Sequence, residues 1–360
     1  MTSPERAQDP GQEPPLRVVE VDPFDDAALA AWHQVYAAAE AHDLGDLATP
    51  WQLAEVRAMM QRPGSGSWQG AWAGVLGDGP DAPVVAAGWM RIPLLDNLDR
   101  AELTVHVLPT HRRRGHGSAL LAHLEQVARE RGRRILATET AYPYAAGPAG
   151  DGVPGPELAR ARGYVFGLGD VQRRLRLPVA TDLLDRLAGE AAGHHAAYTL
   201  RSWVGPVPEE LLVGWAELTA SLMTEAPTGE LDLEPESADP RVVREREELL
   251  ERQGRTSHAT VALDADGAVV AYSELVTTVH EPGRAYQWGT LVRRAHRGHR
   301  LGVAVKVATL RLLQERRPDV TQVLTYNAEV NDHMIAVNEL LGFEPVARLG
   351  EFQKVLEPRG

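Results

Sequence analysis

Apolar and polar positions alternate along the chain so as to predict the same series of strands and helices twice. A period of two favours a strand, and apolar residues every three or four positions favour a helix. In each half, a strand that follows a hairpin runs into a short basic turn and then an amphipathic helix. These strands are expected at Arg100–Val107 and Ala285–Val292, and the helices at Gly117–Arg131 and Gly302–Glu315.

The other expected elements occupy matching places in the two halves. The first half has a strand at 16–21, helices at 25–40 and 51–61, a hairpin at 67–90 with GDGPD at its bend, a strand at 134–140 and a short helix at 157–162. The second has a strand at 199–204, helices at 209–222 and 241–253, a hairpin at 257–276 with Asp-Gly at its bend, and a strand at 322–327 followed by a helix. Asp-Gly between alternating apolar runs is a strong hairpin signal. A terminal strand pair is expected to close each half, and an Ala-rich stretch at 181–192 to form a connecting helix.

Identical residues recur in the two halves at a nearly constant spacing. Arg112 and Gly117 recur as Arg297 and Gly302, 185 positions later in both cases. Such a spacing over most of a chain indicates tandem domains and not a short-period solenoid. The expected organisation is a disordered tail at 1–15, a domain at 16–178, a linker helix region at 179–197 and a second domain at 198–360.

Composition excludes several classes of function. The 360 residues are 44% hydrophobic and 24% charged, which is typical of a globular protein. A net charge of −13 argues against a nucleic-acid partner, and no apolar run is long enough to span a membrane, so a cytoplasmic protein is expected. The absence of Cys excludes disulfides, thiolate zinc sites and a Cys nucleophile. The His spacing resembles no metal site, so no metal is expected.

The basic, Gly-bearing turn between strand and helix is the best candidate site. The start of a helix offers N–H groups without intrahelical acceptors and the positive end of the helix dipole, and Gly lets an anion approach the backbone. Each half is therefore predicted to bind a pyrophosphate. The candidate residues are Val107, Arg112, Arg113, Arg114, Gly115, His116, Gly117 and Ser118 in the first half, and Val292, Arg297, Gly298, His299, Arg300, Leu301 and Gly302 in the second.

A dinucleotide-binding fingerprint is an alternative interpretation of the first turn. Glu139 lies about where such a fingerprint places its ribose-binding acid. However, the third Gly is missing after Gly117, the turn follows a hairpin and not the first strand of a domain, and the second copy lacks the G-x-G pair. This alternative therefore fits less well than a pyrophosphate site of another kind.

The element order and the R-x-x-G-x-G motif resemble the GCN5-related N-acetyltransferase (GNAT) superfamily, from about Leu16 to the C-terminus. The resemblance implies an α/β (α+β) fold with two tandem GNAT-like domains, each a mixed, splayed β-sheet flanked by helices. It also implies acetyl-CoA in the splay, with its pyrophosphate on the turn. Arg300 replaces the middle Gly of the second copy, where it could bind phosphate or block the approach to the backbone.

The resemblance also implies positions for catalytic groups. Superfamily members often place a basic glutamate where Glu102 stands, although Glu102 could also be a solvated residue at a strand edge. The matching residue of the second half is Gln287, which cannot accept a proton, so Glu274 on the preceding strand is the alternative base there, unless it only faces outward. Ala159 and Asn338 replace the usual general-acid Tyr, and this departure puts the acid role in doubt.

Two asparagines near the start of the last helix add to the second site. Superfamily members commonly bind CoA with an Asn at this place, and Asn331 is the best match, with Asn327 nearby. Asn331 could instead cap its helix, or do both.

The expected function is acetyl transfer from acetyl-CoA to a primary amine of a small molecule or peptide, by direct attack. Backbone N–H groups near Val107 and Val292 would polarise the thioester. Glu102 and the intact first turn favour catalysis by the first half. The Asn-rich last helix favours the second half, as does the similarity to mycothiol synthase, in which the C-terminal unit does the chemistry. The alternative is a non-catalytic or regulatory acyl-CoA-binding protein with degenerate domains. A monomer or homodimer is expected.

Overall fold

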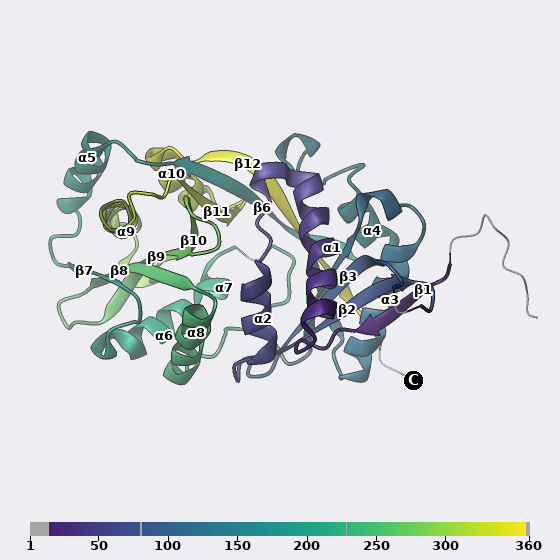
Figure 1. The fold of residues 1–360 in the computed structure, drawn as a ribbon. Coiled ribbons are helices and arrows are strands. Elements are labelled where there is room, and N and C mark those ends of the chain that lie inside the picture. The colour runs from purple at the N-terminus through teal and green to yellow at the C-terminus, as the bar shows by residue number, and fades with distance from the viewer. Residues whose placement is uncertain (1–13, 80, 228, 358–360) are drawn as a thin grey trace, which may run out of the picture.

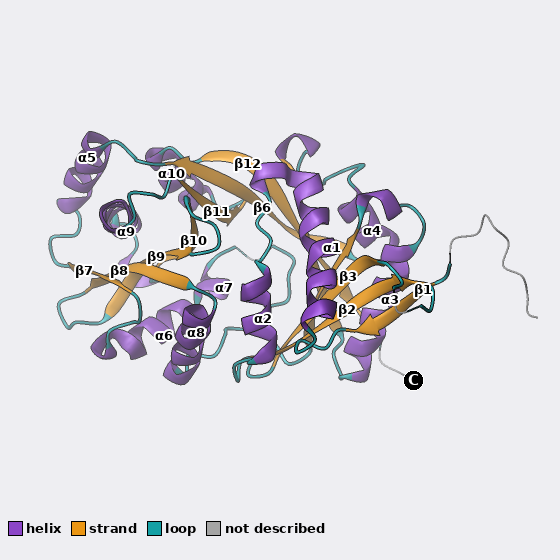
Figure 2. Ribbon diagram, viewed as in Figure 1, coloured by secondary structure: helices purple, strands orange, loops and turns teal. Residues whose placement is uncertain are grey.

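The strands of both halves join in one continuous sheet (Figure 1). The computed structural model describes residues 14–79, 81–227 and 229–357, so the expected tail at 1–15 lies almost entirely outside the described residues. Within them, twelve strands follow the order β1-β2-β3-β4-β5-β12-β6-β11-β10-β9-β8-β7. Helices cover the sheet in both halves (Figure 2). The expected mixed α/β fold is confirmed.

The elements lie close to the expected ranges. The strands are β1 (Leu16–Glu20), β2 (Ser67–Leu76), β3 (Val84–Pro93), β4 (Arg100–Val107), β5 (Ile135–Pro143), β6 (Val165–Arg176), β7 (Thr199–Val204), β8 (Arg255–Leu263), β9 (Val269–Thr278), β10 (Arg284–Val292), β11 (Gln322–Ala328) and β12 (Glu344–Val355). The helices are α1 (Asp26–Leu44), α2 (Leu53–Gln61), α3 (His116–Glu130), α4 (Pro154–Ala161), α5 (Thr181–Ala192), α6 (Leu212–Ala220), α7 (Leu222–Glu225), α8 (Pro240–Arg252), α9 (Leu301–Arg316) and α10 (Asp332–Leu341). We call β1–β6 the first half and β7–β12 the second half.

The last strands of the two halves are exchanged. β12, at the end of the chain, pairs with β5 of the first half, and β6 of the first half pairs with β11 of the second. β6 and β12 also pair with each other and run side by side between the halves (Figure 1). The terminal strand pair expected within each half is therefore wrong. Each half supplies one long strand, and the pair forms between the halves.

The sheet splays at equivalent places in the two halves. The parallel strands β4 and β5 pair only from Arg100 to Glu102, opposite residues 135–137. The parallel strands β10 and β11 pair only from Arg284 to Gln287, opposite residues 322–325. Beyond these short ladders the strands separate toward the turns, as the predicted splay requires.

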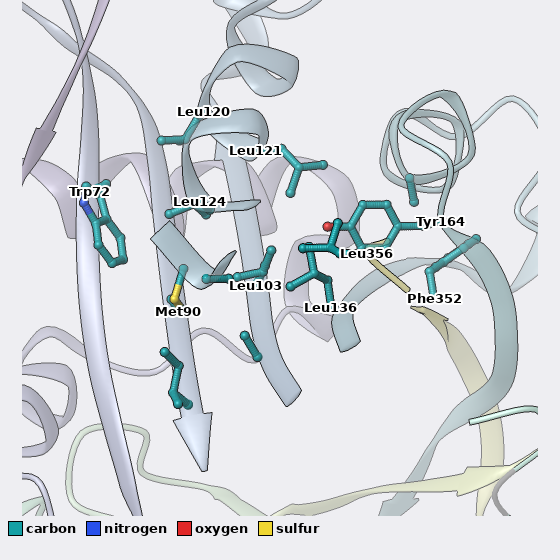
Figure 3. Packing of buried hydrophobic residues seen from close by; sticks show 14 of the residues in the cluster. Trp72, Met90, Leu103, Leu120, Leu121, Leu124, Leu136, Tyr164, Phe352 and Leu356 are labelled. Carbon is teal, nitrogen blue, oxygen red and sulfur yellow. The ribbon is translucent and has the colours of Figure 1, made fainter. Parts of the chain in front are cut away.

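Leucines of α3 pack on the first half of the sheet and fix the helix that follows the first turn. Leu120 and Leu124 are fully buried against Leu103 and Leu136 of the two splaying strands (Figure 3). Each such side chain contributes about 1.5–3 kcal/mol when it leaves water. The packing therefore holds the start of α3 rigidly at the open end of the splay.

A buried ion pair joins the two halves. Glu55 of α2 and Arg255 of β8 form two hydrogen bonds, of 2.9 and 3.0 Å. The Glu55 side chain has no exposed area and that of Arg255 has 5%. Thr278 donates a further bond to Glu55, and Trp51 stacks on the Arg255 guanidinium. Both carboxylate oxygens of Glu55 and two nitrogens of Arg255 thus have partners, as a buried charge requires.

Candidate active site

The two turns adopt the same backbone conformation although their glycines differ. In the first turn Arg113 and Gly115 have positive φ angles of 63° and 87°. The residues 185 positions later, Gly298 and Arg300, have φ angles of 89° and 51°. A Cβ added at Gly115 would meet no atom within 4 Å, so a side chain at this place points to open space. Accordingly, Arg300 extends away from the turn, toward Glu190 of α5 at 3.3 Å.

The motif arginines hold the turns in place. Arg112 donates from Nε to the Val107 carbonyl at 3.1 Å and forms two bonds to Asp43 of α1, of 2.7 and 2.9 Å. Arg297 donates in the same way to the end of β10 at 3.3 Å and to Glu225 of α7 at 2.9 Å. Both guanidinium groups are thus bound by the protein itself, and the backbone of the turn is the part left for an anion.

A cavity of about 520 Å³, which we call the turn cavity, lies in the splay of the first half. It runs from the turn, at Gly115, Gly117 and Ser118, between β4 and β5 to Thr138 and Glu139. The first bond within α3 joins the Ala119 N–H to the Gly115 carbonyl, so the preceding N–H groups have no acceptor inside the helix. A Cβ at Gly117 would lie 3.2 Å from Leu158 of α4, so Gly keeps this end of the cavity open.

Buried, hydrogen-bonded polar side chains lie at the corresponding place in the second half. Lys306 stands 185 positions after Leu121, which lines the turn cavity. It is 1% exposed, and its ammonium donates to Asn338 at 2.8 Å, whose amide donates to Asn327 at 3.0 Å. Burial without a carboxylate partner lowers the pKa of Lys306 to about 7.

The connection between the halves covers the second turn. His299 lies 3.2 Å from the His194 carbonyl, and His296 lies 3.1 Å from the Tyr198 hydroxyl. Together with the contact between Arg300 and α5, these bonds place residues 190–198 against the second turn. The first turn instead borders the turn cavity.

A second cavity, of about 230 Å³, lies where the halves meet, and we call it the acidic cavity. Strands β3, β4, β5 and β12 line it, together with Met223, Leu233, Glu234 and Glu236 of the second half. Its carboxylates are Asp96, Glu102, Glu139, Glu234, Glu236 and Glu351, and its cations are Arg91 and Arg100. Thr138 and Glu139 line both cavities, so the two spaces meet at this point of β5.

Glu139 and Glu351 face each other at this junction. They are register partners on the antiparallel strands β5 and β12. Desolvation, and then the nearby Glu351, Glu102, Glu40 and Asp170 carboxylates, raise the pKa of Glu139 to about 8, although its side chain is exposed where it lines the two cavities. Desolvation, and then Asp170, raise the pKa of Glu351 to about 7, although Arg100 opposes the rise. A carboxylate that titrates near neutral pH can both take and return a proton there.

Of the expected bases, Glu102 lies in the acidic cavity and forms an ion pair of 2.9 Å with Arg91. Gln287 of the second half uses its amide to hold the bulge in β10, with bonds to the carbonyls of Glu274 at 2.6 Å and Gly289 at 2.8 Å.

The carboxylate of Glu274 is buried in a pair with Arg246 at 3.0 Å and accepts a bond of 2.9 Å from Ser257. Asn331 caps α10 by accepting a bond of 3.1 Å from the Met334 N–H. Neither residue lines the turn cavity or the acidic cavity.

Sequence reasoning did not select the two carboxylates at the junction as catalytic candidates. From the sequence, Glu139 is a candidate only for the ribose-binding acid of a dinucleotide site, although the strand expected at 134–140 includes it. Glu351 carries no local signal, because only the strand exchange brings β12 beside β5.

Within the described ranges, no helix is long and apolar enough to cross a membrane. No group of three or more His, Asp or Glu side chains in the same part of the chain is arranged to hold a metal ion.

Comparisons with known proteins agree with the fold and the turn. Residues 32–146 match the acetyltransferase (GNAT) family. A tandem GNAT protein from the clavulanic acid biosynthesis pathway is 29% identical, with a TM-score of 0.74 over 96% of this chain and all of that one. A GCN5-related N-acetyltransferase from Sphaerobacter thermophilus has the same fold at 16% identity, with a TM-score of 0.64 over 96% of this chain and 98% of that one. A search of curated proteins found no match.

The match includes β4, the first turn, α3 and β5, which line the turn cavity together with α4 outside the match. The tandem relative extends the likeness over both halves. GNAT proteins in general use acetyl-CoA and act on amine acceptors. The first half therefore contains a GNAT domain, and the whole chain is similar to a tandem GNAT protein, which supports an N-acetyltransferase.

Proposed function

We propose that the first half binds acetyl-CoA in the turn cavity and transfers the acetyl group to a primary amine held in the acidic cavity. The observation that carries this proposal is the junction of the two cavities at Thr138 and Glu139. A thioester that enters from the turn and an amine that enters from the opposite side of the sheet meet there. The second half binds no cofactor, because Lys306 and Asn338 fill its splay and residues 190–198 cover its turn.

The backbone supplies the groups that hold the cofactor. N–H groups at the start of α3 bind the pyrophosphate, and Gly117 leaves room for the approach. Beyond Glu102, the edge of β4 that faces the gap has no strand partner, so N–H groups near Val107 can bind the thioester oxygen. These donors strengthen as the carbonyl oxygen gains charge during attack.

Glu139 acts as the general base. A typical alkylammonium has a pKa near 10.4, so freeing its amine at pH 7 costs about 4–5 kcal/mol. The ammonium transfers a proton to the Glu139 carboxylate, and the amine nitrogen then forms a bond to the acetyl carbon. The carbon–sulfur bond breaks, coenzyme A leaves as a thiolate, whose pKa is near 8.5, and the attacking nitrogen loses its second proton to water to give the neutral amide. No general acid is needed, in keeping with Ala159 at the place of the usual Tyr.

The acceptor is a cationic amine. Six carboxylates and two arginines line the acidic cavity, so its net charge favours an ammonium ion. The side chains of Glu139, Glu236 and Glu351 form no ion pair and no hydrogen bond within the described residues. These three carboxylates are available to a positively charged substrate.

A valine at Gly117 is expected to weaken acetyl-CoA binding at least about tenfold, since it crowds Leu158 and displaces the pyrophosphate from the helix start. The matched change in the second half, Gly302→Val, has more room, because a Cβ there would lie 3.8 Å from Val292. Calorimetric titration of both variants with acetyl-CoA tests the assignment. Loss of affinity in G302V together with wild-type affinity in G117V would assign the cofactor to the second half.

A further inference from the structure

The exchanged strand β12 brings a side chain of the second half into the site of the first. Glu351 lies directly opposite Glu139 in the register of β12 and β5. Side chains at directly opposed positions of antiparallel strands have their Cβ atoms about 4.5–5.5 Å apart. Both residues line the acidic cavity, and neither has an ion pair within the described part of the chain.

We propose that Glu351 is a positioning residue for Glu139, so that the second half completes the active site of the first. This inference rests on the proposed function, because it assigns Glu351 a role only if Glu139 is the base. Glu351 keeps a negative charge beside Glu139 and thereby disfavours its ionised form in the free enzyme. The two carboxylates then share a proton, which leaves when an ammonium ion binds between them.

The charged groups around the pair come from three elements. Arg100 and Glu102 lie on β4, Asp170 on β6 and Glu40 on α1. Arg100 is the one cation among them, and it donates to Gln353 of β12 at 3.2 Å and to the Asp232 carbonyl at 3.4 Å. The neighbourhood of the pair is thus net negative, which supports retention of a shared proton.

The second half lacks this pair. Glu102 pairs with Ala137, and its counterpart Gln287 pairs with Thr325, so Asn327 takes the place of Glu139. The residue opposite Asn327 is Val171 of β6. Strand exchange therefore places two carboxylates in the splay of the first half and none in the splay of the second. Because Glu139 and Glu351 belong to different halves, neither half contains the pair by itself.

The pH dependence of kcat/KM in the full-length enzyme tests this role. Wild-type activity rises with pH as the base ionises. Glu351→Gln removes the like charge and so lowers the pKa of Glu139. The rising part of the pH profile, called the limb below, should therefore shift to lower pH by about one unit. Glu351→Asp keeps the charge and should keep the limb near its wild-type position. Glu344→Gln changes an exposed carboxylate at the other end of β12 and should leave the limb unchanged.

An unchanged limb in E351Q, or an equal loss of activity at every pH, would overturn the role of Glu351. If E351Q loses nearly all activity and Glu139→Gln only shifts the limb, Glu351 is the base instead of Glu139. That result would overturn the inference as well. If E139Q keeps both the wild-type rate and the wild-type limb, the proposed function itself fails. Melting temperatures of the variants separate these results from misfolding.

Discussion

Replacement of Glu139 by Gln is expected to lower kcat by about 10²–10⁴-fold at pH 7.5, the usual contribution of a general base. The amide has nearly the same shape as the carboxylate but cannot accept the proton of the ammonium ion. Affinity for acetyl-CoA should change little, because the pyrophosphate binds at the other end of the turn cavity. The measurement is release of coenzyme A thiol with a panel of cationic amines. Glu130→Gln, on the outer face of α3, is the control.

The same variant should be at least as stable as the wild type. The pKa of Glu139 is raised from 4.5 to about 8 in the folded protein. Between these pH values the folded state holds a proton that the unfolded chain has lost, so stability falls with rising pH across that window. Gln removes this unfavourable ionisation. E139Q with wild-type kcat, or with a much lower melting temperature at pH 8.5, would contradict the assignment.

Replacement of Arg255 by Met is expected to lower the free energy of unfolding by about 3–5 kcal/mol, because it leaves the Glu55 charge buried without its partner. The ion pair also holds α2 of the first half against β8 of the second, so the loss should loosen the junction that forms the acidic cavity. Chemical denaturation gives the free energy, and thiol release shows whether activity falls with it.

Arg186→Met is the matched control, because Arg186 forms an exposed pair with Glu190 one helical turn away. Its expected cost is below about 1 kcal/mol. Equal stabilities of the two variants would show that the buried pair does not hold the halves together.

Local patterns predicted most of the elements, because helix and strand periods are properties of short segments. The strand at 199–204 and the helix at 181–192 match β7 and α5 at both ends. The expected helix at 209–222 is instead divided into a turn of 3₁₀ helix, α6 and α7. The exchange of β6 and β12 was not predictable in this way. Nothing in the sequence of either strand shows which half it pairs with.

The same distinction between local and long-range features applies to the candidate site. The turn was found from sequence because a Gly-bearing helix start after a strand is a local feature. Arg112 was expected to bind phosphate, whereas Asp43, far from it in sequence, already neutralises its charge. The position of Glu351 beside Glu139, and that of residues 190–198 over the second turn, depend on packing between distant segments. Local sequence patterns do not predict such packing.

A structure of the protein with acetyl-CoA at millimolar concentration tests the central claim most directly. We expect one cofactor per chain, with its pyrophosphate at the N–H groups of 115–118, its thioester between β4 and β5, and its acetyl group beside Glu139. A cofactor over residues 300–302, or a turn cavity that stays empty under these conditions, would contradict the account.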